Sequence, residues 1–108
     1  MKKKFLYLDD ELQKSAKLIN QYGFEDYGWD FSNALKLLEV AVGEGWFVLG
    51  GDVYKYVNNT PSVTYDNWYY NFTKQSEYEN SIAHAKDYIM KYHALNGDNY
   101  LYSFVIKD

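Results

Sequence analysis

Residues 46–72 read WFVLGGDVYKYV, then NNTPS, then VTYDNWYYNF. The first and last of these segments are rich in β-branched and aromatic residues, which fit the pleated surface of a sheet. The middle segment holds turn residues, because asparagine tolerates a positive φ angle and proline cannot donate to a strand ladder. We therefore expect a long β-hairpin whose chain reversal lies at residues 58–62.

Each expected strand carries a carboxylate among aromatic side chains. Side chains alternate between the two faces of a strand, so every second residue shares a face. This alternation gives two candidate sets for binding a partner, Asp52, Tyr54 and Tyr56 on the first strand and Asp66, Trp68 and Tyr70 on the second. Gly50 and Gly51 weaken a strand interior and are typical of a bulge, which would exchange the two faces.

Two helices and a loop are expected before the hairpin. Residues 10–22 begin with acidic side chains, which favour the positive end of a helix dipole, so they predict a first helix. Residues 24–29 are expected to form a loop, with Trp29 as a core residue. A second and more apolar helix is expected to begin after Asp30 or Ser32, because either side chain can cap it.

A third helix and a last strand are expected after the hairpin. Ser76 and Glu79 match the S-x-x-E capping box, and apolar residues recur from there at helical spacing as far as Tyr92. Residues 96–99 read NGDN, which predicts a turn, and residues 100–106 read YLYSFVI, which predicts a strand.

The expected fold is therefore an α+β domain that spans residues 1–108. Its sheet has three mainly antiparallel strands, the long central hairpin plus the C-terminal strand, with the first hairpin strand in the middle. Three helices pack against this sheet. No internal repeat or linker composition marks a second domain.

Composition excludes several classes of function. The chain has no cysteine, which excludes disulfides and thiolate metal sites. Its formal net charge is -4 and all its basic residues are lysine, so nucleic acid is not an expected partner. No apolar run approaches a membrane span, and we expect a cytoplasmic protein that does not bind membranes. Aromatic residues make up 20% of the chain, so some tyrosines are expected to face a protein partner.

Two short motifs resemble those of a known family. The run G-G-D-V-Y at residues 50–54 and the run T-Y-D-N-W-Y at residues 64–69 are followed by Ser81, Ala85 and Tyr88. In this order they resemble the immunity protein 40 family of bacterial polymorphic-toxin systems, over roughly residues 30–106. The resemblance implies a small α+β protein that binds and neutralises a cognate toxin.

An enzyme is not expected. His84 and His93 lie nine residues apart on one predicted helix and so on opposite faces, where they cannot share a metal or a proton. Only His84 and Asp87, three residues apart, lie within reach of each other. Motifs for a serine nucleophile, a zinc protease or a phosphate loop are absent. We expect no catalytic residue, no metal site and no cofactor.

Two functions remain open. In the first, Asp52 and Asp66 join Tyr54, Trp68 and Tyr70 in an acidic aromatic patch that binds a basic toxin domain, for which a nuclease is a candidate. Such a protein would be a monomer or a weak homodimer. In the second, the aromatic rings form a stacking platform for a carbohydrate or another small ligand. A structural role also stays open for Asp52, which in that case accepts hydrogen bonds from nearby donors, and for Asp66 as a turn or strand-end residue.

Overall fold

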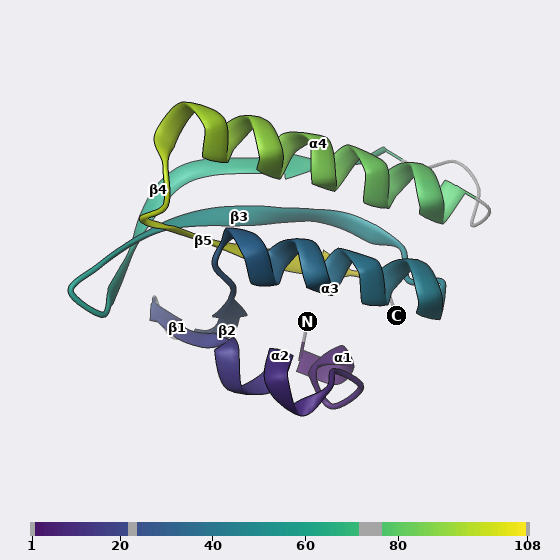
Figure 1. Cartoon of the computed structure of the whole chain (residues 1–108), viewed down its shortest axis with the longest axis horizontal. Coiled ribbons are helices and arrows are strands. Elements are labelled where there is room, and N and C mark those ends of the chain that lie inside the picture. Colours follow the sequence, from purple (N-terminus) through teal and green to yellow (C-terminus); the bar gives the residue numbers. More distant parts are fainter. Residues whose placement is uncertain (1, 22–23, 72–76, 108) are drawn as a thin grey trace.

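The computed structural model describes residues 2–21, 24–71 and 77–107. Its elements, in chain order, are α1 (Lys2–Phe5), α2 (Asp10–Ser15), β1 (Lys17–Gln21), β2 (Phe24–Gly28), α3 (Phe31–Glu44), β3 (Val48–Val57), β4 (Thr60–Tyr69), α4 (Tyr78–Asn96) and β5 (Tyr100–Ile106). Strands β3, β4 and β5 form one sheet, and β1 and β2 form a two-stranded hairpin. Figure 1 shows α3 and α4 side by side across one face of the larger sheet. None of the described helices is long and apolar enough to cross a membrane.

The larger sheet has the predicted arrangement. β3 lies in the middle and pairs antiparallel with β4 on one side and with β5 on the other. The helix α4 connects β4 to β5, as the order of the last helix and strand predicts. The α+β class, the antiparallel sheet and the central place of the first hairpin strand are therefore confirmed.

The hairpin turn is tighter than predicted. Asn58 and Asn59 have φ angles of 54° and 57°, which fits a two-residue type I′ turn. Thr60 already begins β4, so Thr60, Pro61 and Ser62 belong to a strand and the prediction of a turn over residues 58–62 is wrong in its second half. Proline is tolerated there because β4 is an edge strand, where a missing backbone donor costs little.

The core lies between the sheet and the helices α3 and α4. Both helices bury one stripe of small and branched residues, such as Leu38 in α3 and Ile89 in α4. The sheet contributes Val53 and its neighbours on the same face. Ser81 in α4 joins the two layers, because its buried hydroxyl accepts a hydrogen bond of 3.0 Å from the backbone N–H of Val48 in β3.

The second and third predicted helices are confirmed as α3 and α4. Asp30 caps α3, where its side chain accepts a hydrogen bond of 3.0 Å from the backbone N–H of Asn33. Gly45 ends α3 in the left-handed conformation, with a φ of 70°. Ser76, from the predicted capping box of α4, lies outside the described residues.

The first predicted helix is wrong beyond Ser15. α2 ends there and the chain continues as β1, which pairs with β2 where the sequence predicts a loop. Ile19 explains the difference, because it is buried and packs beside Gly28 and Leu101. A Cβ on Gly28 would lie only 2.8 Å from Ile19 Cδ1, so the glycine makes room for this contact. Tertiary burial of one branched side chain thus outweighs a weak helical pattern.

Trp29 links the β1–β2 hairpin to the larger sheet. Its backbone N–H donates to Tyr102 O at 2.9 Å, and the Tyr102 N–H donates to Trp29 O at 2.8 Å, which makes an isolated antiparallel bridge beside β5. Its indole is fully buried and donates through Nε1 to Leu12 O at 2.9 Å. The predicted core role of Trp29 is confirmed.

Candidate functional site

The two sequence motifs meet on neighbouring strands. Gly51 of the first motif lies opposite Trp68 of the second, and Asp52 lies opposite Asn67. A Cβ on Gly51 would collide with the Trp68 indole and with the carbonyl oxygen of Ser103. Only glycine therefore leaves room for the tryptophan, and the two motifs form one packing unit.

The six residues predicted to bind a partner lie on opposite faces of the sheet. Val53 packs against the helices, so Asp52 and Tyr54 on either side of it face away from them. The face away from the helices carries Asp52, Tyr54 and Tyr56, and the face toward α4 carries Asp66, Trp68 and Tyr70. The expectation that these residues form one patch is therefore wrong.

Helix α4 holds the residues on the inner face. Trp68 is only 5% exposed and stacks on Tyr88, with ring centroids 5.1 Å apart. The Tyr92 hydroxyl donates a hydrogen bond of 2.8 Å to Asp66 Oδ2. A stacking platform that combines Trp68 with Tyr54 does not form, because one ring is buried and the other lies on the opposite face.

The sheet face opposite α3 and α4 forms the candidate site, and we name it the open face. Its accessible side chains come from all three strands, with Asp52, Tyr54 and Tyr56 from β3, Asn67 and Tyr69 from β4, and Val105 from β5. Leu101 and Ser103 of β5 also point to this face but are buried, and Leu101 lies beside Ile19 of the β1–β2 hairpin. A shallow depression of about 270 Å³ lies over Gly50 and Gly51, because glycines leave that part of the sheet without side chains. Tyr69 and Val105 line this depression and are exposed.

Asp26 from β2 joins Asp52 at the open face. Burial raises the pKa of Asp26, and the charge of Asp52 adds to the rise, although the Tyr27 N–H opposes it by donating a 2.8 Å hydrogen bond to Asp26 Oδ1. Burial also raises the pKa of Asp52. Burial, followed by the charges of Asp52 and Asp26, raises the pKa of the Tyr54 hydroxyl. The open face thus holds partly desolvated carboxylates beside a tyrosine.

Sequence reasoning misses Asp26 as part of this site. It lies in the segment FEDYGW, whose residues follow no clear helix or strand period. The pairing of Asp26 with Ile19 places both on one face of the hairpin, and Ile19 packs beside Leu101 of β5. Only this tertiary contact brings the carboxylate to the sheet.

A bulge interrupts β4 beside the open face. The register between β3 and β4 shifts between Asp52 and Tyr54, where residues 64–66 of β4 lie opposite Val53 alone, two residues more than in a regular ladder. The Thr64 hydroxyl donates to Val53 O at 2.7 Å and accepts from the Asp66 N–H at 3.0 Å. Tyr65, between them, has a φ of 67° and is exposed. No glycine or asparagine at this position signals the positive φ in the sequence.

Comparison with family models agrees with the fold and the motif geometry. The model of immunity protein 40 matches residues 17–106, from the start of β1 to the end of β5. The chain belongs to the immunity protein 40 family. The predicted resemblance is confirmed, and the match also includes the β1–β2 hairpin that carries Asp26. No significant match was found among curated proteins or among solved structures. Membership of an immunity protein family implies toxin neutralisation and a cognate toxin as partner.

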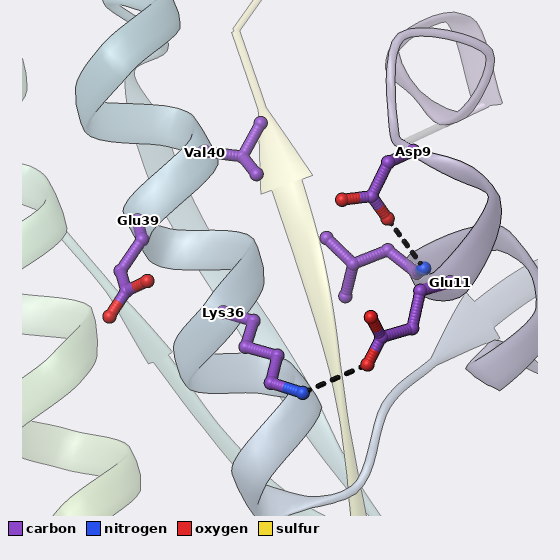
Figure 2. A pocket seen from close by; sticks show the side chains of 6 residues that line it. Asp9, Glu11, Lys36, Glu39 and Val40 are labelled. Atoms are coloured by element: carbon purple, nitrogen blue, oxygen red, sulfur yellow. Dashed lines mark hydrogen bonds and ion pairs between the residues drawn. The ribbon is translucent and has the colours of Figure 1, made fainter.

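A second hollow of this immunity protein, about 410 Å³, lies between α2 and α3 (Figure 2). Asp9 caps α2 there by accepting a hydrogen bond of 2.9 Å from the Leu12 N–H. Lys36 of α3 reaches across to Glu11 of α2 with 3.0 Å between Nζ and Oε1, and Figure 2 shows both interactions. These charges serve capping and helix contact, and none of the predicted binding residues lines the hollow.

The histidines of the immunity protein lie on α4, away from the open face. His93 Nε2 lies 2.6 Å from Asp98 Oδ1, and Asp87 pairs with Lys91 at 3.0 Å. His84 lies beside the ring of Tyr70. Within residues 2–21, 24–71 and 77–107, no three side chains of the metal-binding types gather.

Proposed function

We propose that this immunity protein neutralises its toxin by binding it on the open face, through contact alone and without catalysis. The observation that carries the proposal is the pair Asp26 and Asp52, two partly buried carboxylates with raised pKa values on the sheet face opposite α3 and α4, at the border of the β1–β2 hairpin. A raised pKa means that the charged carboxylate is poorly solvated where it stands. A basic group of the toxin that contacts such a carboxylate therefore lowers the free energy of the charge by more than it would at a fully hydrated carboxylate.

Aromatic side chains around the carboxylates supply the apolar part of the contact. Tyr54, Tyr56 and Tyr69 lie on the same face, and tyrosine offers a large contact area with little rotamer entropy to lose. The depression over Gly50 and Gly51 gives a toxin side chain a place to enter. Aromatic anchors surrounding a few charges are typical of binding hot spots.

A basic toxin surface fits this face. The formal net charge of the chain is -4, so the whole molecule adds to the attraction of a cationic partner. Complementary charge speeds encounter and selects among partners. A toxin that acts on nucleic acid presents a basic cleft, and a nuclease domain is therefore the class of partner that we favour.

The test is a binding measurement with the toxin domain encoded beside the gene of this chain, in a catalytically inactive form. Asp52→Lys should raise the Kd more than about tenfold, or about 1.4 kcal/mol, because it places a like charge opposite the basic toxin surface. Circular dichroism and thermal melting verify that the variant is folded. Co-expression with the active toxin should show the matching loss of protection.

The matched control is Glu44→Lys, which makes the same change in net charge at the exposed end of α3. It should leave the Kd within about twofold of the native value, because its charge acts only at long range. An equal loss of affinity in Asp52→Lys and Glu44→Lys would mean that the net charge of the protein, and not the open face, governs binding. Native affinity in Asp52→Lys would place the interface on another surface.

A further inference from the structure

We propose that Tyr65 is the aromatic anchor by which this protein enters an apolar cleft of its toxin, and that the β4 bulge fixes the backbone at this position before binding. The inference rests on the proposed function, since it places the toxin on the neighbouring open face. Tyr65 is 81% exposed and is the most exposed of the large aromatic side chains on the described part of the sheet.

The backbone conformation distinguishes Tyr65 from other exposed tyrosines. Among the described non-glycine residues, a positive φ occurs at Asn58, Asn59 and Tyr65. Asparagine adopts this region readily, whereas in tyrosine the Cβ crowds the following carbonyl and makes the conformation unfavourable. Residues held in such conformations persist where their surroundings over-determine them, and they concentrate at binding sites.

Hydrogen bonds on both sides impose this conformation. Before Tyr65, the Thr64 hydroxyl donates to Val53 O in β3 at 2.7 Å. After it, Asp66 accepts from the Tyr92 hydroxyl of α4 at 2.8 Å. The Thr64 hydroxyl also accepts from the Asp66 N–H and so closes the bulge across Tyr65. The neighbours therefore fix the bulge, while the exposed ring adds little packing to the fold.

The bulge places Tyr65 beside the acidic open face. The residues on either side of the bulge, Val63 and Asn67, pair with Tyr54 and Asp52 on β3. Tyr65 therefore lies on the edge strand between the residues that pair with Asp52 and Tyr54. A cleft that is apolar inside and carries lysine or arginine at its rim complements this arrangement of one ring beside acidic groups. Because the backbone at Tyr65 is already fixed, only its side-chain rotamers lose entropy on binding.

The test replaces Tyr65 by asparagine, which accepts the left-handed conformation and lacks the ring. For the inactive toxin domain, Tyr65→Asn should raise the Kd at least about tenfold, while the Tm stays equal or rises because the unfavourable conformation is relieved. The matched control is Tyr7→Asn, which removes a ring that is 70% exposed. Tyr7 directly follows α1, an element that Figure 1 shows away from β4. This control should keep the native Kd.

The outcomes separate this inference from the proposed function. A native Kd for Tyr65→Asn, with binding lost in Asp52→Lys, overturns the anchor and leaves the open face as the interface. A lower Tm for Tyr65→Asn with no change in Kd overturns the anchor as well, because the ring then serves the fold. Weaker binding in Tyr65→Asn but not in Asp52→Lys supports the anchor and overturns the acidic contact. Failure of the native chain to bind the toxin domain overturns both.

Discussion

At position 51 the absence of a side chain is what allows Trp68 to reach the core. Gly51→Ala should lower the free energy of unfolding by about 1–3 kcal/mol, because the added carbon overpacks the site. Urea denaturation measures the change. Gly43→Ala in α3 is the matched control, since nothing lies within 4 Å of a Cβ there, and alanine should instead raise the stability by about 0.5–1 kcal/mol. A change of the same sign in the free energy of unfolding of Gly51→Ala and Gly43→Ala would contradict the packing role of Gly51.

The raised pKa of Asp52 predicts opposite effects on stability and binding. A carboxyl group whose pKa rises on folding contributes stability below its unfolded pKa, and this contribution is lost as the pH rises through the folded pKa. At pH 7 the charged group is therefore unfavourable to the fold. Asp52→Asn should raise the Tm at pH 7, by an amount that vanishes toward pH 3, and should weaken toxin binding.

Thermal melting at both pH values checks this prediction, with Glu39→Gln as control because Glu39 is an exposed carboxylate of α3. The control should leave the Tm unchanged. A lower Tm for Asp52→Asn at pH 7 would show that the carboxylate accepts structural hydrogen bonds, which is the other role that the sequence leaves open for it.

Between elements, the hydrogen bond from Tyr92 to Asp66 ties α4 to the edge strand β4. Burial and this hydrogen bond raise the pKa of Tyr92 to about 12. The phenol donates only while protonated, so its stabilising effect is complete below an unfolded pKa of about 10 and is lost as the pH rises through the folded pKa. The free energy of unfolding should fall between pH 10 and about 12.

Urea denaturation across this pH range measures that fall in the native chain and in Tyr92→Phe. The variant should show a smaller decline, because it has no phenol to titrate and no bond to lose. A residual decline is expected from Tyr102, whose pKa burial also raises. If the free energy of unfolding fell with pH equally in the native chain and in Tyr92→Phe, the titration of Tyr92 would not contribute to the pH dependence of stability.

Elements with strong local signals are predictable from this sequence. For α3, the capping residue Asp30, the apolar stripe and the closing glycine all lie within one short segment, and each acts on its nearest neighbours. Residues 16–28 lack such signals. Their strands depend on the burial of Ile19 against Leu101, a residue far away in the chain, and no local pattern reports that contact.

The sequence also does not predict which side chains of the hairpin lie on which face of the sheet. The side-chain period of a strand is two, so the register of the hairpin decides which residues of its two strands share a face. The two-residue turn at Asn58 and Asn59 sets this register, and the bulge in β4 adds two residues opposite Val53, which leaves the alternation unchanged. Asp52 therefore lies opposite Asn67 on the open face, whereas Trp68 lies opposite Gly51 and under α4.

On the scale of the whole molecule, the two faces of the larger sheet differ in role, since one stabilises the fold and the other is the candidate binding surface. The inner face packs on α3 and α4 and carries most of the apolar core. The outer face packs on the β1–β2 hairpin at Leu101 and elsewhere carries polar and aromatic groups, as antiparallel sheets with one solvated side commonly do. Substitutions at the open face can therefore change binding while the core keeps the fold.

The net charge of -4 predicts a salt-dependent association with a basic toxin. The association rate constant should fall severalfold when salt rises from about 0.1 M to about 1 M, because the screening length shortens from about 10 Å to about 3 Å. The dissociation rate constant should change less, since short-range contacts control it. Stopped-flow or surface plasmon resonance measures both. An association rate that does not respond to salt would contradict a basic partner.

The residues alone assign this chain to the α+β class and to its family, and they predict the hairpin that follows α3 and precedes α4 in the chain. This is possible because caps, turns and short motifs act over a few neighbouring positions. The composition of the open face, with Asp26 beside Asp52, Tyr65 on a bulge and Trp68 turned inward, emerged only in three dimensions. The reason is physical: the register across the turn decides which face each side chain takes, and distant packing selects between a helix and a strand where local preference is weak.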